Sequence, residues 1–436
     1  MLLTKLKIEK LFDDYNFEVK FNPDITLLYG MNGCGKTTIL NIITAIITGE
    51  MYKLYAYRFS RIELNYKSDG ADKEETINIC YADNEIEVEF QKQKFIVCHL
   101  ERLEVPHSRR EEILNYFEEN PISLQIKQTF NYVYLSLNRT NSVFDDRRYY
   151  YRSLQRNSIR NNSINEPENI DPGVSYVEDL VYQKHGEMLM ALNKVNEEFR
   201  NTVLKSALDV KQTKDFYNTK IVNKNIDRIK DAYVNLLKTW NLISAKEEDQ
   251  YNQWFEKYIE LQTNPEKAPY TEKIDFVAMT FELEKIKKII EIANNAESKK
   301  SSILHPLNEF LGTVNDFISS NEFKKEIIIE NGRIGFVMPN NPRKNSIQYL
   351  SSGERQVVIF FANLIFGVDD NSTGIFVVDE PELSLHLAWQ RRFLEKAMAV
   401  EKKVQFIFAT HSPEIVGKYQ NKTVRVVGEV ENRQNG

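Results

Sequence analysis

Eight residues rich in glycine, placed between two apolar runs, leave this chain few choices of fold. The segment Gly30-Met-Asn-Gly-Cys-Gly-Lys-Thr37 fits the pattern G-x-x-x-x-G-K-[ST] at every fixed position. The apolar run 25–29 precedes it, and the apolar run 39–47 follows at helical spacing and stops at Gly49. This order predicts a buried strand, a tight turn, and a helix that begins on the turn.

The residue types in this segment suit the binding of a nucleotide's phosphates. Glycines let backbone N–H groups turn inward around phosphate oxygens, and the following helix presents its positive end to the same anion. Lys36 is expected to reach the β- and γ-phosphates, and the Thr37 hydroxyl to bind Mg²⁺. A chance glycine turn is the alternative, and the flanking strand and helix argue against it. The nucleotide-binding residues predicted here are Asn32, Gly33, Cys34, Gly35, Lys36, Thr37 and Thr38.

An acidic pair follows a further apolar run. The run 374–378 delivers Asp379 and Glu380 at its carboxyl end, where ligands gather in open α/β sheets. Asp379 is predicted to bind Mg²⁺, and Glu380 to orient or deprotonate the attacking water. Alone, such a pair could end any strand. Together with the glycine loop it predicts hydrolysis of ATP.

The segment Leu350-Ser-Ser-Gly-Glu-Arg-Gln356 opens another predicted helix, which runs to about Gly367. Ser351 suits the N-cap and Glu354 suits the first turn, which is sound chemistry in any helix. The same segment is also a helix N-terminus ready for an anion, about 30 residues before the acidic pair. The sequence therefore allows both a structural and a phosphate-binding interpretation of Ser351, Gly353 and Glu354.

The order of these motifs resembles the RecF/SMC/OLD-type branch of the ABC ATPases. Walker A at 30–37, a signature at 350–356, Walker B at 374–380 and a histidine in Thr410-His411-Ser412-Pro413 occur in that family's order. The sequence DEPELSLHLAWQ…FIFATHSPEI is most similar to OLD-like ATPases of bacterial antiphage systems, such as those of PARIS and Septu. Ser352 replaces the commoner glycine of the signature, and no glutamine of the Q-loop is evident in the strand 132–139.

The resemblance implies a nucleotide shared between two copies of the chain. Ser351 and Gly353, with Glu354 in the same segment, are then expected at the γ-phosphate of ATP bound to the other subunit. His411 is expected to be the switch histidine beside that phosphate, so the implied catalytic residues are Glu380 and His411. ATP and Mg²⁺ are the expected cofactors, and a homodimer or a higher even-numbered homo-oligomer is the expected assembly.

The motifs divide the chain into an α/β head formed by both ends and a long insertion. We expect the N-terminal part of the head at 1–50, a β-rich lobe at 51–139 and a helical insert at 173–322. A flexible loop rich in Arg, Tyr and Asn is expected at 140–172, with contact to nucleic acid as its alternative. The C-terminal part of the head is expected at 323–436. Within the insert, helices are predicted over 177–203, 226–240 and 276–292.

The composition of the chain argues against several classes of function. The formal net charge of −6 excludes a uniformly basic nucleic-acid coat, and no apolar run approaches the ~20 residues of a membrane span. Cys34, Cys80 and Cys98 form no C-x-x-C pair, so neither a disulfide framework nor a zinc site is indicated. A cytoplasmic protein without a membrane partner is expected.

Several functions fit these motifs. The first is an ATPase that acts as sensor or scaffold of a two-component antiphage defence system, with a separate nuclease or toxin effector encoded by an adjacent gene. The alternative is a RecF-like DNA-repair ATPase that binds DNA on an ATP-closed dimer. A transporter subunit is disfavoured because hundreds of residues separate Lys36 from Ser351. A purely structural module is disfavoured by the intact Glu380 and His411.

Overall fold

The computed structural model describes residues 1–71, 73–82, 85–97, 120–136, 171–208, 225–240, 242–263, 269–319, 324–368 and 373–430. The chain forms two compact units. Unit 1 comprises Met1–Lys184 and Asn308–Gly436, and unit 2 comprises His185–Leu307. Apart from Asp171 and Pro172, the Arg/Tyr/Asn-rich loop predicted at 140–172 lies outside the described residues.

A parallel sheet forms the centre of unit 1. Its strand order is β14-β3-β13-β12-β8, with bounds β3 Ile25–Tyr29, β8 Asn131–Ser136, β12 Gly374–Asp379, β13 Val404–Thr410 and β14 Thr423–Arg425. All of β12 is buried, as its uninterrupted apolar run predicts for a strand covered on both faces. The register sets Asp379 opposite Ala409 and Thr410 opposite Tyr29, so the carboxyl ends of β12, β13 and β3 meet at one edge.

The last strand expected in the β-rich lobe at 51–139 belongs to a different sheet. The pattern placed a strand at 132–137 in the β-rich lobe, whereas β8 pairs with β12 in the central parallel sheet. Register Asp379↔Ser136 brings the end of β8 beside the acidic pair. Periodicity identified this strand but could not assign its partner, because pairing depends on residues more than 200 positions away.

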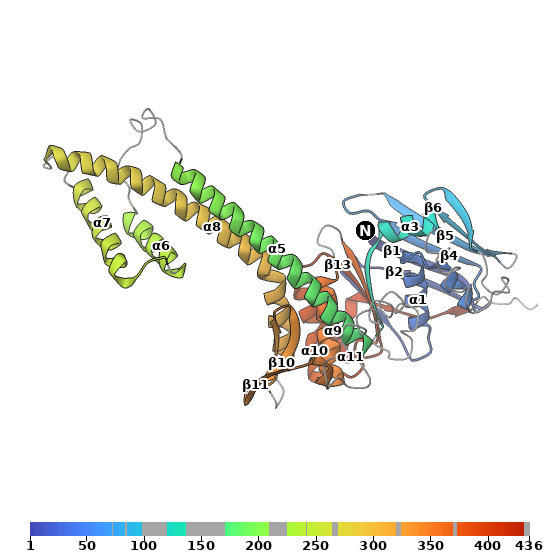
Figure 1. Ribbon diagram of the computed structural model, residues 1–436. Helices are drawn as coiled ribbons and strands as arrows, with labels where there is room; N and C mark the ends of the chain where they lie inside the picture. The colour runs from blue at the N-terminus through green and yellow to red at the C-terminus, as the bar shows by residue number, and fades with distance from the viewer. Residues whose placement is uncertain are drawn as a thin grey trace, which may run out of the picture. The chain divides into compact units, whose positions relative to one another are not determined.

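A largely antiparallel sheet lies against the first one (Figure 1). Its order is β15-β2-β1-β4-β5-β6-β7, and it begins at the N-terminus rather than at residue 51. The bounds are β1 Leu2–Leu11, β2 Tyr15–Lys20, β4 Arg61–Lys67, β5 Glu74–Ala82, β6 Glu85–Phe90, β7 Gln93–Val97 and β15 Glu429–Val430. Helix α1, Lys36–Ile47, buries Ile39, Ile42 and Ile46 in the core that both sheets share. A 3₁₀ turn at Met51–Ala56 and helix α3, Pro121–Thr129, border this core.

The opposite face of the parallel sheet is covered by helices α9, Ser352–Phe366, and α10, Leu387–Ala399. Phe360 of α9 lies 5.3 Å from the ring of Phe376 on β12 and 4.4 Å from Phe393 on α10, measured between ring centroids. This aromatic packing fixes the start of α9 relative to the end of β12. Unit 1 also contains β9 Glu326–Glu330, β10 Arg333–Met338, β11 Asn341–Asn345, the 3₁₀ turns Ile347–Tyr349 and Gly417–Lys422, and α11 Pro413–Val416.

Unit 2 is helical, and its two longest helices extend beyond the ranges that the sequence pattern predicted. Helix α5 spans Pro172–Leu208, and α8 spans Tyr270–Ile318 instead of 276–292; both begin or end in unit 1. They run side by side and antiparallel (Figure 1), joined by Glu198–Lys299 at 3.1 Å. Beyond residue 292 the apolar period fades, but small residues Ala293 and Ala296 are buried and let the helix continue against its neighbour.

Two shorter helices complete unit 2. Helix α6 is found at Ile226–Thr239, as predicted, while α7 at Ala245–Thr263 was not predicted. Phe255 and Tyr258 of α7 are fully buried with Leu283 of α8 in a small apolar cluster. The many acidic and amide residues of α7 conceal this short apolar stripe in a sequence pattern. Over the described residues, no helix combines the length and apolarity needed to span a membrane.

Candidate nucleotide-binding and hydrolysis site

The glycine loop has the backbone geometry that its sequence demands. Gly33 and Gly35 adopt φ angles of 81° and 99°, in the region that favours glycine, and Gly35 caps the N-terminus of α1. Asn32 and Gly33 are exposed, while Cys34, Gly35, Thr37 and Thr38 are half-buried. The loop therefore presents an open backbone surface at the positive end of α1, where a phosphate fits.

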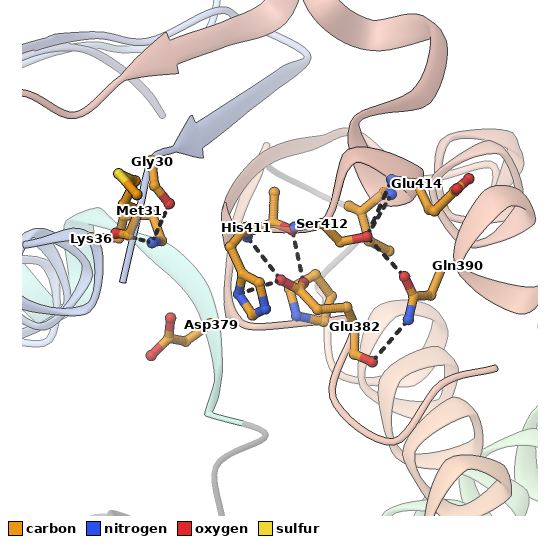
Figure 2. Close-up of polar contacts among 12 residues, drawn as sticks. Gly30, Met31, Lys36, Asp379, Glu382, Gln390, His411, Ser412 and Glu414 are labelled. Carbon is orange, nitrogen blue, oxygen red and sulfur yellow. Dashed lines mark hydrogen bonds and ion pairs between the residues drawn. The ribbon is translucent and has the colours of Figure 1, made fainter. Parts of the chain in front are cut away.

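Lys36 is buried and folds back over this loop. Its Nζ donates to the carbonyl oxygen of Gly30 at 2.8 Å and to that of Met31 at 3.0 Å (Figure 2). These two carbonyls hold the ammonium group at the mouth of the loop. A phosphate bound there gains a charge-assisted contact from Lys36.

Thr37 and Asp379 come together from opposite ends of the chain. The Thr37 hydroxyl donates to Oδ1 of Asp379 at 3.3 Å, and Asp379 is 1% exposed. Burial raises the pKa of Asp379 to about 6; the nearby Glu380 and Glu382 carboxylates also raise it, whereas the Thr37 hydrogen bond and Lys36 act in the opposite sense. A buried carboxylate whose ionised form is penalised in this way is suited to a cation.

The donor set fits Mg²⁺ that is shared with a nucleotide. Mg²⁺ usually takes one or two protein oxygens and completes its shell with water and phosphate oxygens. Thr37 and Asp379 supply a hydroxyl and a carboxylate at this position. Within the described ranges, no cluster of three or more His, Cys, Asp and Glu side chains could hold a metal by itself.

Glu380 occupies a strained turn directly after β12. Its φ angle is 50°, which non-glycine residues rarely adopt and which is common at functional sites. Its backbone N–H donates to the carbonyl of Ala409 at 2.9 Å, which ties the turn to β13. The strain is thus maintained by a cross-strand contact next to Asp379.

His411 lies at the end of β13 and is held by an acid that the sequence analysis did not select. Its Nδ1 lies 3.0 Å from Oε1 of Glu382, and its side chain is 44% exposed (Figure 2). Glu382 is only 7% exposed. Glu382 lies two positions after the acidic pair in the sequence, but no spacing rule connects it with a residue that follows a different strand.

The signature segment gives Ser351 and Glu354 structural partners in the same chain. They form a capping box: Ser351 Oγ accepts from the Glu354 N–H at 3.3 Å, and Glu354 Oε2 accepts from the Ser351 N–H at 2.8 Å. The buried Glu354 also pairs with Lys325 at 2.8 Å. Burial alone raises the pKa of Glu354, but Lys325 and the Ser351 N–H outweigh it and hold the pKa below its ordinary value.

This result bears on the interpretation of Glu354 and Gly353. The carboxylate of Glu354 contacts Lys325 and the Ser351 N–H, which fits the capping interpretation of this residue; its predicted contact with a nucleotide stays a prediction. A Cβ on Gly353 would lie 2.5 Å from the carbonyl oxygen of Ser384, so glycine permits the loop 381–385 to pack on the start of α9. Ser351 itself is exposed.

The strand ends therefore bring Lys36, Thr37, Asp379, Glu380 and His411 to one edge of the parallel sheet. In the signature segment, Glu354 pairs with Lys325, and Gly353 lies against the 381–385 loop. The Q-loop position also cannot be traced past the end of β8, because residues 137–170 lie outside the described ranges.

Comparison with known proteins supports this assignment of chemistry. Residues 1–416 match the model of a family described as the AAA ATPase domain. A probable ATPase of retron Vc95 from Vibrio cholerae is 24% identical over 98% of this chain and 74% of its own length. A probable ATPase of retron Ec83 from Escherichia coli is 25% identical over 30% of this chain and 24% of its own length.

Solved structures of Smc head domains align with most of the chain. An Smc head with an extended coiled coil, bound to the C-terminal domain of ScpA from Pyrococcus furiosus, gives a TM-score of 0.42 at 13% identity over 99% of this chain and 96% of that one. The Smc head with a coiled coil and joint from Pyrococcus yayanosii gives 0.38 at 14% identity, over 99% and 96%. The predicted α/β P-loop fold is confirmed by the parallel sheet and the family match, and the chain belongs to the AAA ATPase domain family and is an ATPase.

Proposed function

We propose that this protein is a Mg²⁺-dependent ATPase of a two-component bacterial defence system. It is the sensor or scaffold subunit of that system, and a separate protein is the effector. Two copies close on ATP, and the ATP-closed state controls a nuclease or toxin. The observation that carries the enzymatic part is the hydrogen bond between Thr37 and the buried Asp379 at the glycine loop.

The role proposed for each residue is inferred from its place at the edge of the parallel sheet. Lys36 and the loop backbone would bind the β- and γ-phosphates, and Thr37 with Asp379 would hold Mg²⁺, which would supply neutralising charge to those phosphates. Glu380 orients or deprotonates the attacking water, and His411 contacts the γ-phosphate from the neighbouring strand end. Catalysis here relies on positioning and charge neutralisation rather than on a covalent intermediate.

Closure of two copies on ATP is supported by exposed apolar side chains within the motifs themselves. Met31 of the glycine loop is 85% exposed, Tyr349 before the signature 58%, and Leu387 after the 381–385 loop 57%. Large apolar side chains at three functional segments suit a surface that a partner covers. The exposed Ser351 at the start of α9 is then free to meet the γ-phosphate held by the other copy.

The defence role is supported by the curated relatives. Both carry retron names, so we infer a retron-type system for this chain in preference to PARIS or Septu. The long paired helices α5 and α8, with the cluster of α6 and α7, offer unit 2 as the surface that binds the effector. The proposed assembly of this chain is a homodimer or a higher even-numbered homo-oligomer.

Two measurements test the proposal together. The protein is expressed with its neighbouring genes, and mass photometry with and without ATP reports both self-association and companion proteins. Glu380→Gln in the same background is expected to retain ATP and to accumulate the closed assembly. If no companion protein is recovered and ATP instead promotes tight, salt-sensitive DNA binding, the RecF-like DNA-repair function replaces the defence role.

A further inference from the structure

Glu382 makes an unusually complete set of contacts to the segment that carries His411. Its Oε1 accepts from the His411 backbone N–H at 2.8 Å and lies 3.0 Å from the His411 Nδ1. Its Oε2 accepts from the Thr410 hydroxyl at 2.8 Å. One buried carboxylate thus contacts both the backbone and the ring of the residue that follows β13 (Figure 2).

The burial of Glu382 explains why these contacts matter. Taking a carboxylate out of water is costly unless hydrogen bonds or an opposite charge compensate. Among the ion pairs of the described residues, the partner of Glu382 is His411. The carboxylate therefore has a strong preference for the arrangement in which the imidazole donates from Nδ1.

That preference fixes the ring. A hydrogen on Nδ1 that points at Glu382 sets the ring plane and leaves Nε2 as the nitrogen that faces away from the carboxylate. A carboxylate that holds an imidazole in this manner is a general device for orienting a functional histidine. The 44% exposure of the His411 side chain leaves the remaining edge of the ring accessible.

The loop after His411 has an independent anchor, so Glu382 is not needed merely to keep it folded. The Ser412 hydroxyl donates to Oε1 of Gln390 at 2.8 Å and caps the short helix α11. Gln390 Nε2 also donates to the carbonyls of Glu382 at 3.3 Å and Leu385 at 2.9 Å. None of these contacts uses the side chain of Glu382, so we expect them to persist when that side chain is changed.

We propose that Glu382 is a positioning residue for hydrolysis, which acts through His411 by fixing its ring so that Nε2 is presented to the γ-phosphate. The inference rests on the role proposed above for His411. At metal-ligating histidines, loss of the orienting carboxylate typically costs about 10–100-fold in metal affinity or activity. By analogy we expect a loss of ~10–100-fold in kcat for Glu382→Ala with little change in KM.

The experiment measures steady-state ATP hydrolysis and nucleotide binding for Glu382→Ala, Glu382→Gln, His411→Ala and the double variant Glu382→Ala/His411→Ala. Gln can still accept from the His411 N–H, so Glu382→Gln is expected to recover part of the loss. Glu395→Gln is the matched control, because it removes one carboxylate from a surface pair with Lys418 at 2.6 Å. Its kcat is expected to equal that of the wild type.

The double variant separates positioning from a general structural effect. If Glu382 acts through His411, adding Glu382→Ala to His411→Ala lowers kcat no further. A further loss in the double variant, or normal turnover of Glu382→Ala beside an impaired His411→Ala, overturns the inference and leaves the proposed function intact. Normal turnover of His411→Ala instead overturns the role of His411 itself. Should Glu382→Ala fail to fold, Glu382→Gln in the two backgrounds decides the same question.

Discussion

Replacing the buried Asp379 by Asn should stabilise the protein without nucleotide and metal, even though it removes a functional carboxylate. Burial raises the pKa of Asp379 from 3.8 to about 6 in the folded protein. A raised carboxyl pKa means that the folded state binds the proton more tightly than the unfolded state. The associated stability is present below pH ~4 and is lost as the pH rises through ~6.

The size of the effect follows from the two pKa values. One pKa unit corresponds to ~1.4 kcal/mol, so ionised Asp379 destabilises the folded protein by about 3 kcal/mol at pH 7.5 and by about 2 kcal/mol at pH 5. The neutral amide of the Asp379→Asn variant has no such dependence on pH. The stability advantage of Asp379→Asn should therefore grow by about 1 kcal/mol between pH 5 and pH 7.5, which is roughly 2 °C in melting temperature for a domain of this size.

The assay is thermal unfolding of both proteins at the two pH values in EDTA without nucleotide. Asp316→Asn is the control, because Lys396 and Arg392 hold the pKa of Asp316 below its ordinary value and its effect should not change between pH 5 and 7.5. A gap between wild type and Asp379→Asn that stays constant or narrows with rising pH refutes the argument. Adding Mg²⁺ and ATP should then stabilise the wild type more than the variant.

Further variants test the remaining parts of the site. Lys36→Ala should lose ATP binding or turnover, because the ammonium group at the loop is removed. Binding of a fluorescent nucleotide and release of phosphate measure the two effects, and unchanged binding would contradict the role of Lys36. Glu380→Gln should bind ATP but accumulate an ATP-loaded closed dimer in mass photometry, and wild-type turnover would argue against it as the base. Ser351→Arg should keep nucleotide binding by the single chain yet block closure and turnover; a normal rate would disprove the shared site. Gly353→Ala should destabilise the protein by about 1–3 kcal/mol in melting experiments, because a Cβ meets the Ser384 carbonyl oxygen at 2.5 Å, and an unchanged melting temperature would show that the loop yields.

The sequence by itself determined the local chemistry of this protein. The pattern 30–37 predicts a tight glycine turn and a helix directly afterwards, and the structure has both, with positive φ at Gly33 and Gly35. The uninterrupted apolar run before Asp379 predicts a strand covered on both faces, and β12 is buried along its whole length. These features depend on neighbours within a few positions, which is why residue type and spacing suffice to predict them.

Only the tertiary structure decided which distant residues meet. Strand order set β8 beside β12 instead of in the β-rich lobe, and it set Glu382 against His411. The structure also showed that Glu354 forms both a capping box with Ser351 and an ion pair with the distant Lys325. Helix α8 continued past its apolar period because burial against α5 outweighs local propensity. Such outcomes depend on packing and desolvation between segments far apart in the chain, and no local pattern encodes them.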